Sequence, residues 1–553
     1  MYKIFRETIS ILNKKEKYKL RILTVCDIVI SVLDILFLAA LLYLIRVYSE
    51  PRSVDLLDKF NYFKINVNPL LPLLFFLPAF TVKNLLAFFT SKREFNFVYQ
   101  VASRISKDVL QGYLHSPYSD YVKVDSSVIN RQIGQQPIEF SHYVLNGFQQ
   151  IFTQSILILI TLIGVTLYKP LLFPLLLLIM APPVLFIGFI LKKKLKTRLE
   201  RGKQTSEKSM QFLQEALSGY IESNTMGKND FFSDRYNRFQ SRLNAHLSER
   251  VSLQNMPSRM IEVFAVLGLF LLVSLNYYYS GQHQVAFVTI GALMISAYKI
   301  IPGIVRIINM VNQIKTYSYT TTGLRVTISN QQESNFEQRL KSVEFNNISF
   351  RYHDKEILNG FSGCMTSGEM TGLSGYSGKG KTTLINILLG FLNQDSGEIY
   401  INEIISGSDK RQKYWPRISY VKQNAFFLHA TIAVNISFQE DKYNERKIQE
   451  VIEATGLTSL VTSLEMGIET MITENGKNFS GGQKQRFALA RALYQDFDLL
   501  ILDEPFSELD TDSERQMLKY LEHLSSLGKM ILLITHSHES LEACHKKFKL
   551  DEN

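Results

Sequence analysis

The residues best suited to chemistry lie at 375–383 and read Gly-Tyr-Ser-Gly-Lys-Gly-Lys-Thr-Thr. Four residues separate Gly375 from Gly380, and Lys381 and Thr382 follow, which is the spacing of a phosphate-binding P-loop. Glycines allow the backbone to fold around an anion with several N–H groups pointing inward. We therefore expect this run to bind nucleotide phosphates, with the Lys381 ammonium at the β- and γ-phosphates and the Thr382 hydroxyl on Mg²⁺.

The sequence around this loop provides the strand and the helix that a P-loop needs. Residues 369–374 can form a short strand, and residues 383–389 have the apolar spacing of a helix. The N-terminal end of such a helix stabilises a bound phosphate. This context argues against a Gly-rich turn with a chance lysine. The residues expected to bind the nucleotide here are Gly375, Tyr376, Ser377, Gly378, Lys379, Gly380, Lys381, Thr382 and Thr383.

Two further apolar runs each end at residues that could act on a phosphate. Residues 499–502 are a buried-strand pattern that ends at Asp503 and Glu504. We expect Asp503 to hold Mg²⁺ and Glu504 to orient and deprotonate the attacking water. The run 530–535 ends at His536, and a neighbouring parallel strand could bring this imidazole to the γ-phosphate.

A second anion-binding pattern lies at 479–483, where Phe-Ser-Gly-Gly-Gln precedes a helical run. It combines a hydroxyl, two glycines and a helix N-terminus. A chain with one P-loop needs only one such site, unless two chains meet head to tail and each covers the nucleotide bound by the other. The residues expected to contact a partner's nucleotide are Ser480, Gly481, Gly482 and Gln483.

From residue 343 onward, short apolar runs alternate with helical patterns, which is typical of an α/β domain. Two strands are expected first, at 343–345 and 348–350. Tyr352 follows the second one. Its ring either stacks on the adenine of a nucleotide or is an ordinary strand tyrosine.

The first half of the chain contains long apolar runs, each close to the ~20 residues that a transmembrane helix needs. Six runs in one half argue against buried helices of a soluble protein. The basic residues around these runs fall on one side, which places the N-terminus and the polar excursions at 91–148 and 192–257 in the cytoplasm. The expected spans are 22–48, 67–89, 151–168, 171–191, 261–279 and 285–310.

Some ionisable residues fall inside the expected spans, where a charge usually faces a cavity or a partner. Asp34, Lys83, Lys299 and Arg306 are therefore candidates for a substrate cavity, and a structural role is the alternative. The net charge of +10 leaves an anionic membrane surface and nucleic acid open as partners. The three cysteines are widely spaced and suggest neither a metal site nor a disulfide framework.

Together these features resemble an ABC transporter, specifically a half-size exporter with six spans followed by one nucleotide-binding domain. The resemblance covers essentially the whole chain. It implies a membrane α-helical domain joined to an α/β P-loop NTPase domain. The expected parts are a transmembrane domain at 1–318, a linker at 319–340 and the nucleotide-binding domain at 341–553.

Each nucleotide-site motif of this family can be matched to residues of the chain. The chain departs from the pattern at Phe479, where leucine is usual, and at Glu508, where a small residue is common. The usual closing strand and helix after His536 are expected to be shortened or absent. The matches are Tyr352 (A-loop), 375–382 (Walker A), Gln423 (Q-loop), 473–476 (X-loop), 479–483 (signature), 499–503 (Walker B), Glu504 (catalytic glutamate), 507–510 (D-loop) and His536 (switch histidine).

The resemblance implies a homodimer that binds ATP with Mg²⁺ and hydrolyses it at composite sites. Glu504, His536 and Gln423 would form the catalytic set, and Thr382, Gln423 and Asp503 would serve Mg²⁺. The protein would be a multi-pass protein of a bacterial inner membrane with a cytoplasmic ATPase domain. It would contact the lipid bilayer and no nucleic acid.

The resemblance leaves the substrate and one rival class open. An amphipathic lipid, a lipid-linked saccharide and a small peptide all fit, because the weak matches at Asn130–Arg131 and at 297–306 are shared by flippases and peptide exporters. A soluble ABC ATPase does not explain six spans. A regulatory channel or receptor with ATP gating is the alternative, although the intact Glu504, His536 and signature favour a pump.

Overall fold

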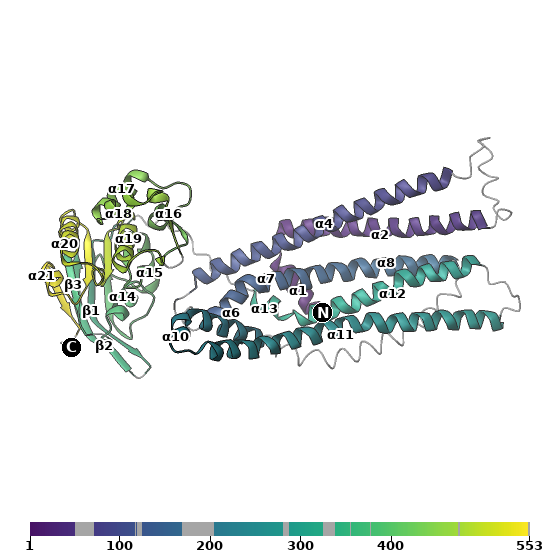
Figure 1. The fold of residues 1–553 in the computed structure, drawn as a ribbon, viewed down its shortest axis with the longest axis horizontal. Helices are drawn as coiled ribbons and strands as arrows, with labels where there is room; N and C mark the ends of the chain where they lie inside the picture. The colour runs from purple at the N-terminus through teal and green to yellow at the C-terminus, as the bar shows by residue number, and fades with distance from the viewer. Residues whose placement is uncertain are drawn as a thin grey trace. The chain divides into compact units, whose positions relative to one another are not determined.

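The computed structural model divides the chain into two compact units (Figure 1). One unit comprises residues 1–116 and 123–329, and the other comprises residues 117–122 and 330–553. The residues that the structure describes are 1–49, 71–116, 118, 124–168, 204–279, 287–324, 338–353, 355–376, 378–473 and 476–550.

Long helices build the first unit and run side by side within it (Figure 1). Three stretches of the described residues are long and apolar enough to cross a membrane, namely Lys14–Leu41, Leu74–Leu114 and Ser126–Gly164. The predicted α-helical membrane domain is thus confirmed. The helices are α1 (Tyr2–Ile11), α2 (Lys14–Ser49), α4 (Leu71–Leu114), α6 (Ser126–Asn130), η3 (Arg131–Gln135), α7 (Gln136–Glu139), η4 (Phe140–Leu145), α8 (Asn146–Tyr168), α10 (Tyr220–Thr225), α11 (Asn229–Tyr279), α12 (Phe287–Thr316) and α13 (Tyr319–Gly323).

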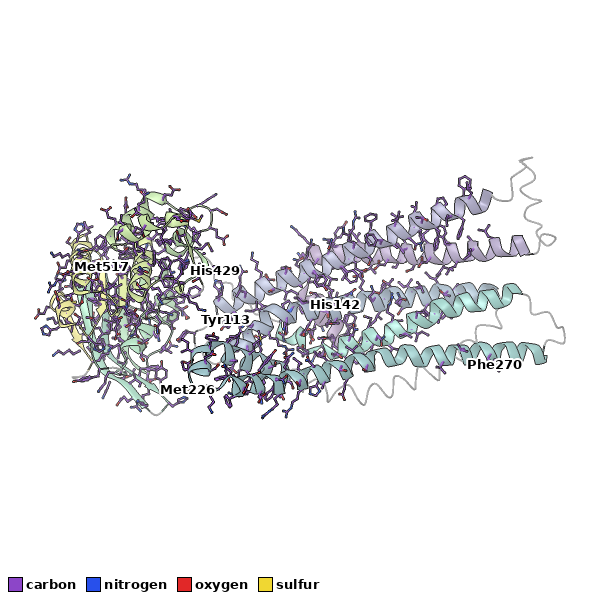
Figure 2. The ribbon with its side chains drawn as sticks, in the orientation of Figure 1. Tyr113, His142, Met226, Phe270, His429 and Met517 are labelled. Atoms are coloured by element: carbon purple, nitrogen blue, oxygen red, sulfur yellow. The ribbon has the colours of Figure 1, made fainter. Side chains whose placement is uncertain are left out.

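The predicted spans map onto these helices in chain order. The first three lie on α2, α4 and α8, and the last two lie on α11 and α12. The predicted span at 171–191 lies outside the described residues. At about 1.5 Å per residue, the 44 residues of α4 and the 51 residues of α11 are far longer than a bilayer core requires. These lengths agree with helices that continue beyond the membrane. Phe270 of α11 is exposed, as expected of a lipid-facing side chain (Figure 2).

The four candidates for a substrate cavity have different surroundings. Lys83 is 6% exposed, and its ammonium forms an ion pair with the Asp34 carboxylate of the neighbouring helix. This pairing fits the structural role, because a buried charge needs a partner. Arg306 is exposed on α12. The side chain of Lys299 lies outside the described part of the chain.

The second unit is the predicted α/β domain, built on two main sheets. One is a parallel sheet with the order β11-β3-β10-β9-β6, and the other is antiparallel with the order β2-β1-β4-β5. The strands are β1 (Ser342–Tyr352), β2 (Lys355–Thr366), β3 (Met370–Ser374), β4 (Ser396–Ile401), β5 (Ile404–Ile405), β6 (Ile418–Val421), β7 (Ala430–Thr431), β8 (Met471–Ile472), β9 (Leu499–Asp503), β10 (Met530–Ile534) and β11 (Lys546–Lys549).

Helices pack against the parallel sheet, so the buried parts of its central strands β9 and β10 are apolar. All five residues of β10 are buried, as are the first four of β9, which explains their unbroken apolar sequence. Met517 of α20 is among the buried residues that pack with them (Figure 2). The helices are α14 (Lys381–Leu388), α15 (Ser408–Gln412), η5 (Trp415–Arg417), α16 (Ile432–Ser437), α17 (Glu445–Ala454), α18 (Thr458–Ser463), η6 (Gly467–Glu469), α19 (Gly481–Tyr494), α20 (Thr511–Ser526) and α21 (His538–Glu542).

One expectation about strands needs correction. The runs 343–345 and 348–350 are parts of a single strand, β1, because a register shift between Phe345 and Ile348 absorbs the two asparagines between them. A closing strand is present after His536, as the four-residue β11, which pairs in parallel with β3.

A glycine at the start of β4 allows the backbone of β1 to come close to β4 at this register shift. Gly397 has φ +89°, and a Cβ there would lie 2.3 Å from the carbonyl oxygen of Asn347. Because that oxygen belongs to the backbone, it cannot move aside as a side chain could.

We expect Gly397→Ala to destabilise the protein by about 1–3 kcal/mol. Thermal unfolding of the purified full chain measures the effect, which is about 2–4 °C per kcal/mol for a unit of this size. Gly407→Ala is the matched control, since no atom lies within 4 Å of a Cβ at that position. Equal melting temperatures for the two variants would contradict the expectation.

Candidate nucleotide-binding and catalytic site

The parallel sheet brings the predicted site residues to one edge. In this sheet β10 lies between β3 and β9, and Ile534 pairs with both Leu373 and Asp503. β6 pairs with β9 on its other side. Because parallel strands end at the same edge of a sheet, the segments that follow β3, β6, β9 and β10 meet there. These segments carry the P-loop, Gln423, Glu504 and His536.

The P-loop has the backbone conformation that its glycines predict. Gly378 and Gly380 have φ of +83° and +93°, values that residues with a side chain rarely adopt. A Cβ on Gly380 would lie 2.9 Å from Cγ2 of Ile357, so the neighbouring strand leaves no room for one. Gly380 is also the N-cap of α14, whose first residue is Lys381.

Lys381 points back along the loop. It is 9% exposed, and its ammonium donates to the carbonyl oxygen of Gly375 at 2.6 Å. Its Nζ also lies 2.9 Å from Nε2 of His536. The structure therefore joins the loop lysine and the predicted switch histidine directly. Among the other loop residues, Thr382 and Tyr376 are exposed, Thr383 is buried, and Ser377 lies outside the described residues.

Glu504 is held between the two other members of the predicted catalytic set. Nε2 of Gln423 donates to its Oε2 at 2.7 Å, and Nε2 of His536 lies 3.3 Å from its Oε1. The Glu504 N–H donates to the carbonyl of Ile534 at 2.9 Å, and its φ is +49°, a strained value for this residue type. The backbone thus turns sharply after β9 and directs the carboxylate toward Gln423 and His536.

Asp503 is half-buried beside Glu504. Burial raises the pKa of Asp503, and the adjacent Glu504 carboxylate raises that pKa further. The hydroxyl of Tyr420 donates to Oδ2 of Asp503 at 3.4 Å, which opposes the shift, as does the nearby Lys381 ammonium. Sequence reasoning assigned no role to Tyr420. The only signal was its place on the strand that leads to Gln423.

The donors at this edge suit a hard divalent cation. The Thr382 hydroxyl, the Gln423 side chain and the Asp503 carboxylate provide oxygen ligands of the kind that Mg²⁺ prefers. Within the described residues, no group of three or more His, Cys, Asp or Glu side chains could hold a metal ion.

The signature residues lie at the start of α19. The Ser480 Oγ accepts from the backbone N–H of Gln483 at 3.4 Å, and the Gln483 Oε1 accepts from the backbone N–H of Ser480 at 2.9 Å. This is a capping box, which fixes the helix N-terminus.

Tyr352 is the last residue of β1 and lies half-exposed. Its ring meets that of Phe350 edge-on, with ring centroids 4.9 Å apart. An exposed face of this ring can accept an adenine. Its role as a nucleotide contact stays a prediction.

Comparisons with known proteins agree with this architecture. Residues 358–507 match the family described as ABC transporter. Among solved structures, a bacterial Atm1-family ABC exporter with ATP bound superimposes with a TM-score of 0.78. The match covers 96% of this chain and 94% of that one at 18% sequence identity. Residues 358–507 therefore match an ABC ATPase domain, and the helical unit shares the fold of the membrane domain of that solved structure.

Two proteins with related sequences have names that describe transporters. A protein named as an export ATP-binding/permease protein of Rickettsia prowazekii is 38% identical over 38% of this chain and 37% of its own length. A protein named ATP-dependent lipid A-core flippase of Cupriavidus pinatubonensis is 28% identical over 66% of this chain and 64% of its own length. These two alignments thus span less than two thirds of the relatives. Residues 358–507 thus match the ABC transporter family, and the chain as a whole has the fold of the solved Atm1-family exporter.

Proposed function

We propose that the protein hydrolyses ATP as a homodimer and uses the energy to move an amphipathic substrate outward from the cytoplasmic side. One observation carries this proposal: Glu504 is held by Gln423 and His536 at the edge of the sheet where the P-loop lies. An intact set of this kind favours an active pump over a receptor or channel that only binds ATP.

Each side chain has a separate role at the proposed ATP site. Lys381 binds the β- and γ-phosphates, and His536, which already contacts Lys381, positions the γ-phosphate. Mg²⁺ would be held by Thr382, Gln423 and Asp503, and it would neutralise charge on the phosphates. Glu504 accepts a proton from the attacking water.

The homodimer completes each site. Residues 480–483 present the N-terminal end of α19, which has 14 residues and a fully formed cap. This end stabilises the phosphates of ATP bound to the partner's P-loop. ATP thereby draws the two ATPase domains together, and hydrolysis separates them.

The membrane domain and the name of one relative support a proposal for the substrate class. The relative from Cupriavidus pinatubonensis is named an ATP-dependent lipid A-core flippase, which supports a lipid or lipid-linked saccharide. Lys299 and Arg306 on α12 would suit the anionic headgroup of such a molecule or a peptide carboxylate. We place the protein in a bacterial inner membrane with its ATPase domain in the cytoplasm.

Mass spectrometry of molecules that copurify with the nucleotide-free protein tests this proposal. We expect a recurrent amphipathic molecule that MgATP releases and that Arg306→Ala or Lys299→Ala depletes. Lys315→Ala, at the end of the same helix, is the matched control and should retain it. A lipid or glycolipid would identify a flippase, and a small peptide would identify a peptide exporter. A purified chain that fails to hydrolyse MgATP in a lipid bilayer would reject the proposal.

A further inference from the structure

The Glu508 carboxylate covers the first turn of the signature helix. A Cβ built on Gly481 would lie 1.2 Å from Oε2 of Glu508 and 2.4 Å from its Cδ. A Cβ on Gly482 would lie 2.7 Å from the Glu508 carbonyl oxygen. The space over both signature glycines is thus occupied by Glu508, the residue at which the D-loop departs from the usual small side chain.

Side chains of the signature helix itself hold the D-loop in this position. The Glu508 N–H donates to Oε1 of Gln485 at 3.0 Å. The side-chain amide of Gln485 also donates, through its Nε2, to the Ser507 hydroxyl at 2.7 Å. Because Gln485 lies on α19, the backbone that carries Glu508 is anchored one turn from the glycines that its carboxylate covers.

The electrostatics favour this contact in the absence of nucleotide. The N-terminal end of a helix carries partial positive charge, and a carboxylate nearby is stabilised. A phosphate is stabilised at the same end for the same reason. Two anions within a few ångströms repel each other, so the helix end cannot favour both at once.

We propose that Glu508 is an internal competitor of ATP at the composite site. Its carboxylate occupies the end of α19 that the proposed function assigns to the phosphates of the partner's nucleotide, and it must move aside before the ATP-bound dimer closes. This inference rests on that proposed function. Its consequence is that ATP binds the closed dimer less tightly than the signature residues alone would allow.

The test is the ATP dependence of hydrolysis by the full chain in lipid nanodiscs. We expect Glu508→Gln and Glu508→Ala to lower the apparent KM for MgATP about three- to tenfold, with kcat within about twofold of the wild type. Glu522→Gln removes the same charge from an exposed position on α20 and is the matched control. It should leave the KM unchanged.

Salt provides a second readout, because screening weakens repulsion between exposed charges. The difference in KM between the wild type and Glu508→Gln should shrink as ionic strength rises from about 0.05 to about 0.5 M. A residue that only stabilises the helix end would instead lower the melting temperature on substitution and leave the KM as it was.

The outcomes separate this inference from the function on which it rests. If the wild type hydrolyses MgATP and both Glu508 variants have its KM, the competitor role is overturned and the ATPase assignment stands. A higher KM in the variants would also overturn it. A wild type without hydrolysis would reject the proposed function itself.

Discussion

Replacement of Glu504 by glutamine will leave ATP binding intact and slow hydrolysis by about a hundredfold or more, the usual range for loss of a general base. Glutamine has nearly the same shape but cannot accept a proton from water. The contacts from Gln423 and His536 show that position 504 is oriented by two neighbours. The backbone strain at φ +49° is similar for both residue types, so stability should change little.

Two measurements on the purified full chain check this expectation. Phosphate release gives kcat, and equilibrium binding of a fluorescent ATP analogue gives the affinity. Glu522→Gln, the same chemical change on the exposed face of α20, controls for the lost charge. Hydrolysis at the wild-type rate by Glu504→Gln would remove this residue from the catalytic set.

Local sequence motifs predicted the backbone around the candidate site, because each motif specifies a local backbone conformation. The glycine spacing from Gly375 to Gly380 specifies a loop with positive φ values, and the structure has them at Gly378 and Gly380. Unbroken apolar runs specify buried parallel strands, and β9 and β10 are buried in this way. The meeting of Glu504 with His536 then follows from the adjacency of these two strands.

Side-chain contacts that depend on tertiary packing could not be predicted from the sequence. No spacing rule relates Tyr420 to Asp503, because their contact depends on β6 lying beside β9. The same holds for the ion pair between Lys83 and Asp34, which are on different helices. The sequence showed that these charges are costly in a membrane. It could not show whether they line a substrate cavity or form an ion pair with each other.

Hydrogen bonds also connect the signature helix to Glu504, and no motif indicates them. Gln485 donates to the Ser507 hydroxyl at 2.7 Å, and that hydroxyl donates to the Glu504 carbonyl at 3.3 Å. The D-loop is therefore a short physical link from α19 to the residue proposed to activate water. A partner's nucleotide at α19 would act at one end of this link, and hydrolysis of the chain's own nucleotide at the other.

Removal of the P-loop lysine should have the second large effect. We expect Lys381→Ala to weaken ATP binding about ten- to a hundredfold, because a hydrogen bond to a charged group contributes about 1.5–3 kcal/mol. In the structure this ammonium is bound to the Gly375 carbonyl and to His536. Nucleotide phosphates would replace these partners, and His536 is exposed enough for water to satisfy it in the variant.

Equilibrium binding of ATP to the full chain measures this loss. Lys379→Ala is the matched control, since Lys379 is exposed in the same loop and the substitution keeps the backbone N–H that would bind a phosphate. Lys381→Arg distinguishes charge from shape. It keeps the positive charge, but a planar guanidinium cannot take the place of a compact ammonium at this buried position. Binding at wild-type affinity by Lys381→Ala would show that the loop does not hold the phosphates through this side chain.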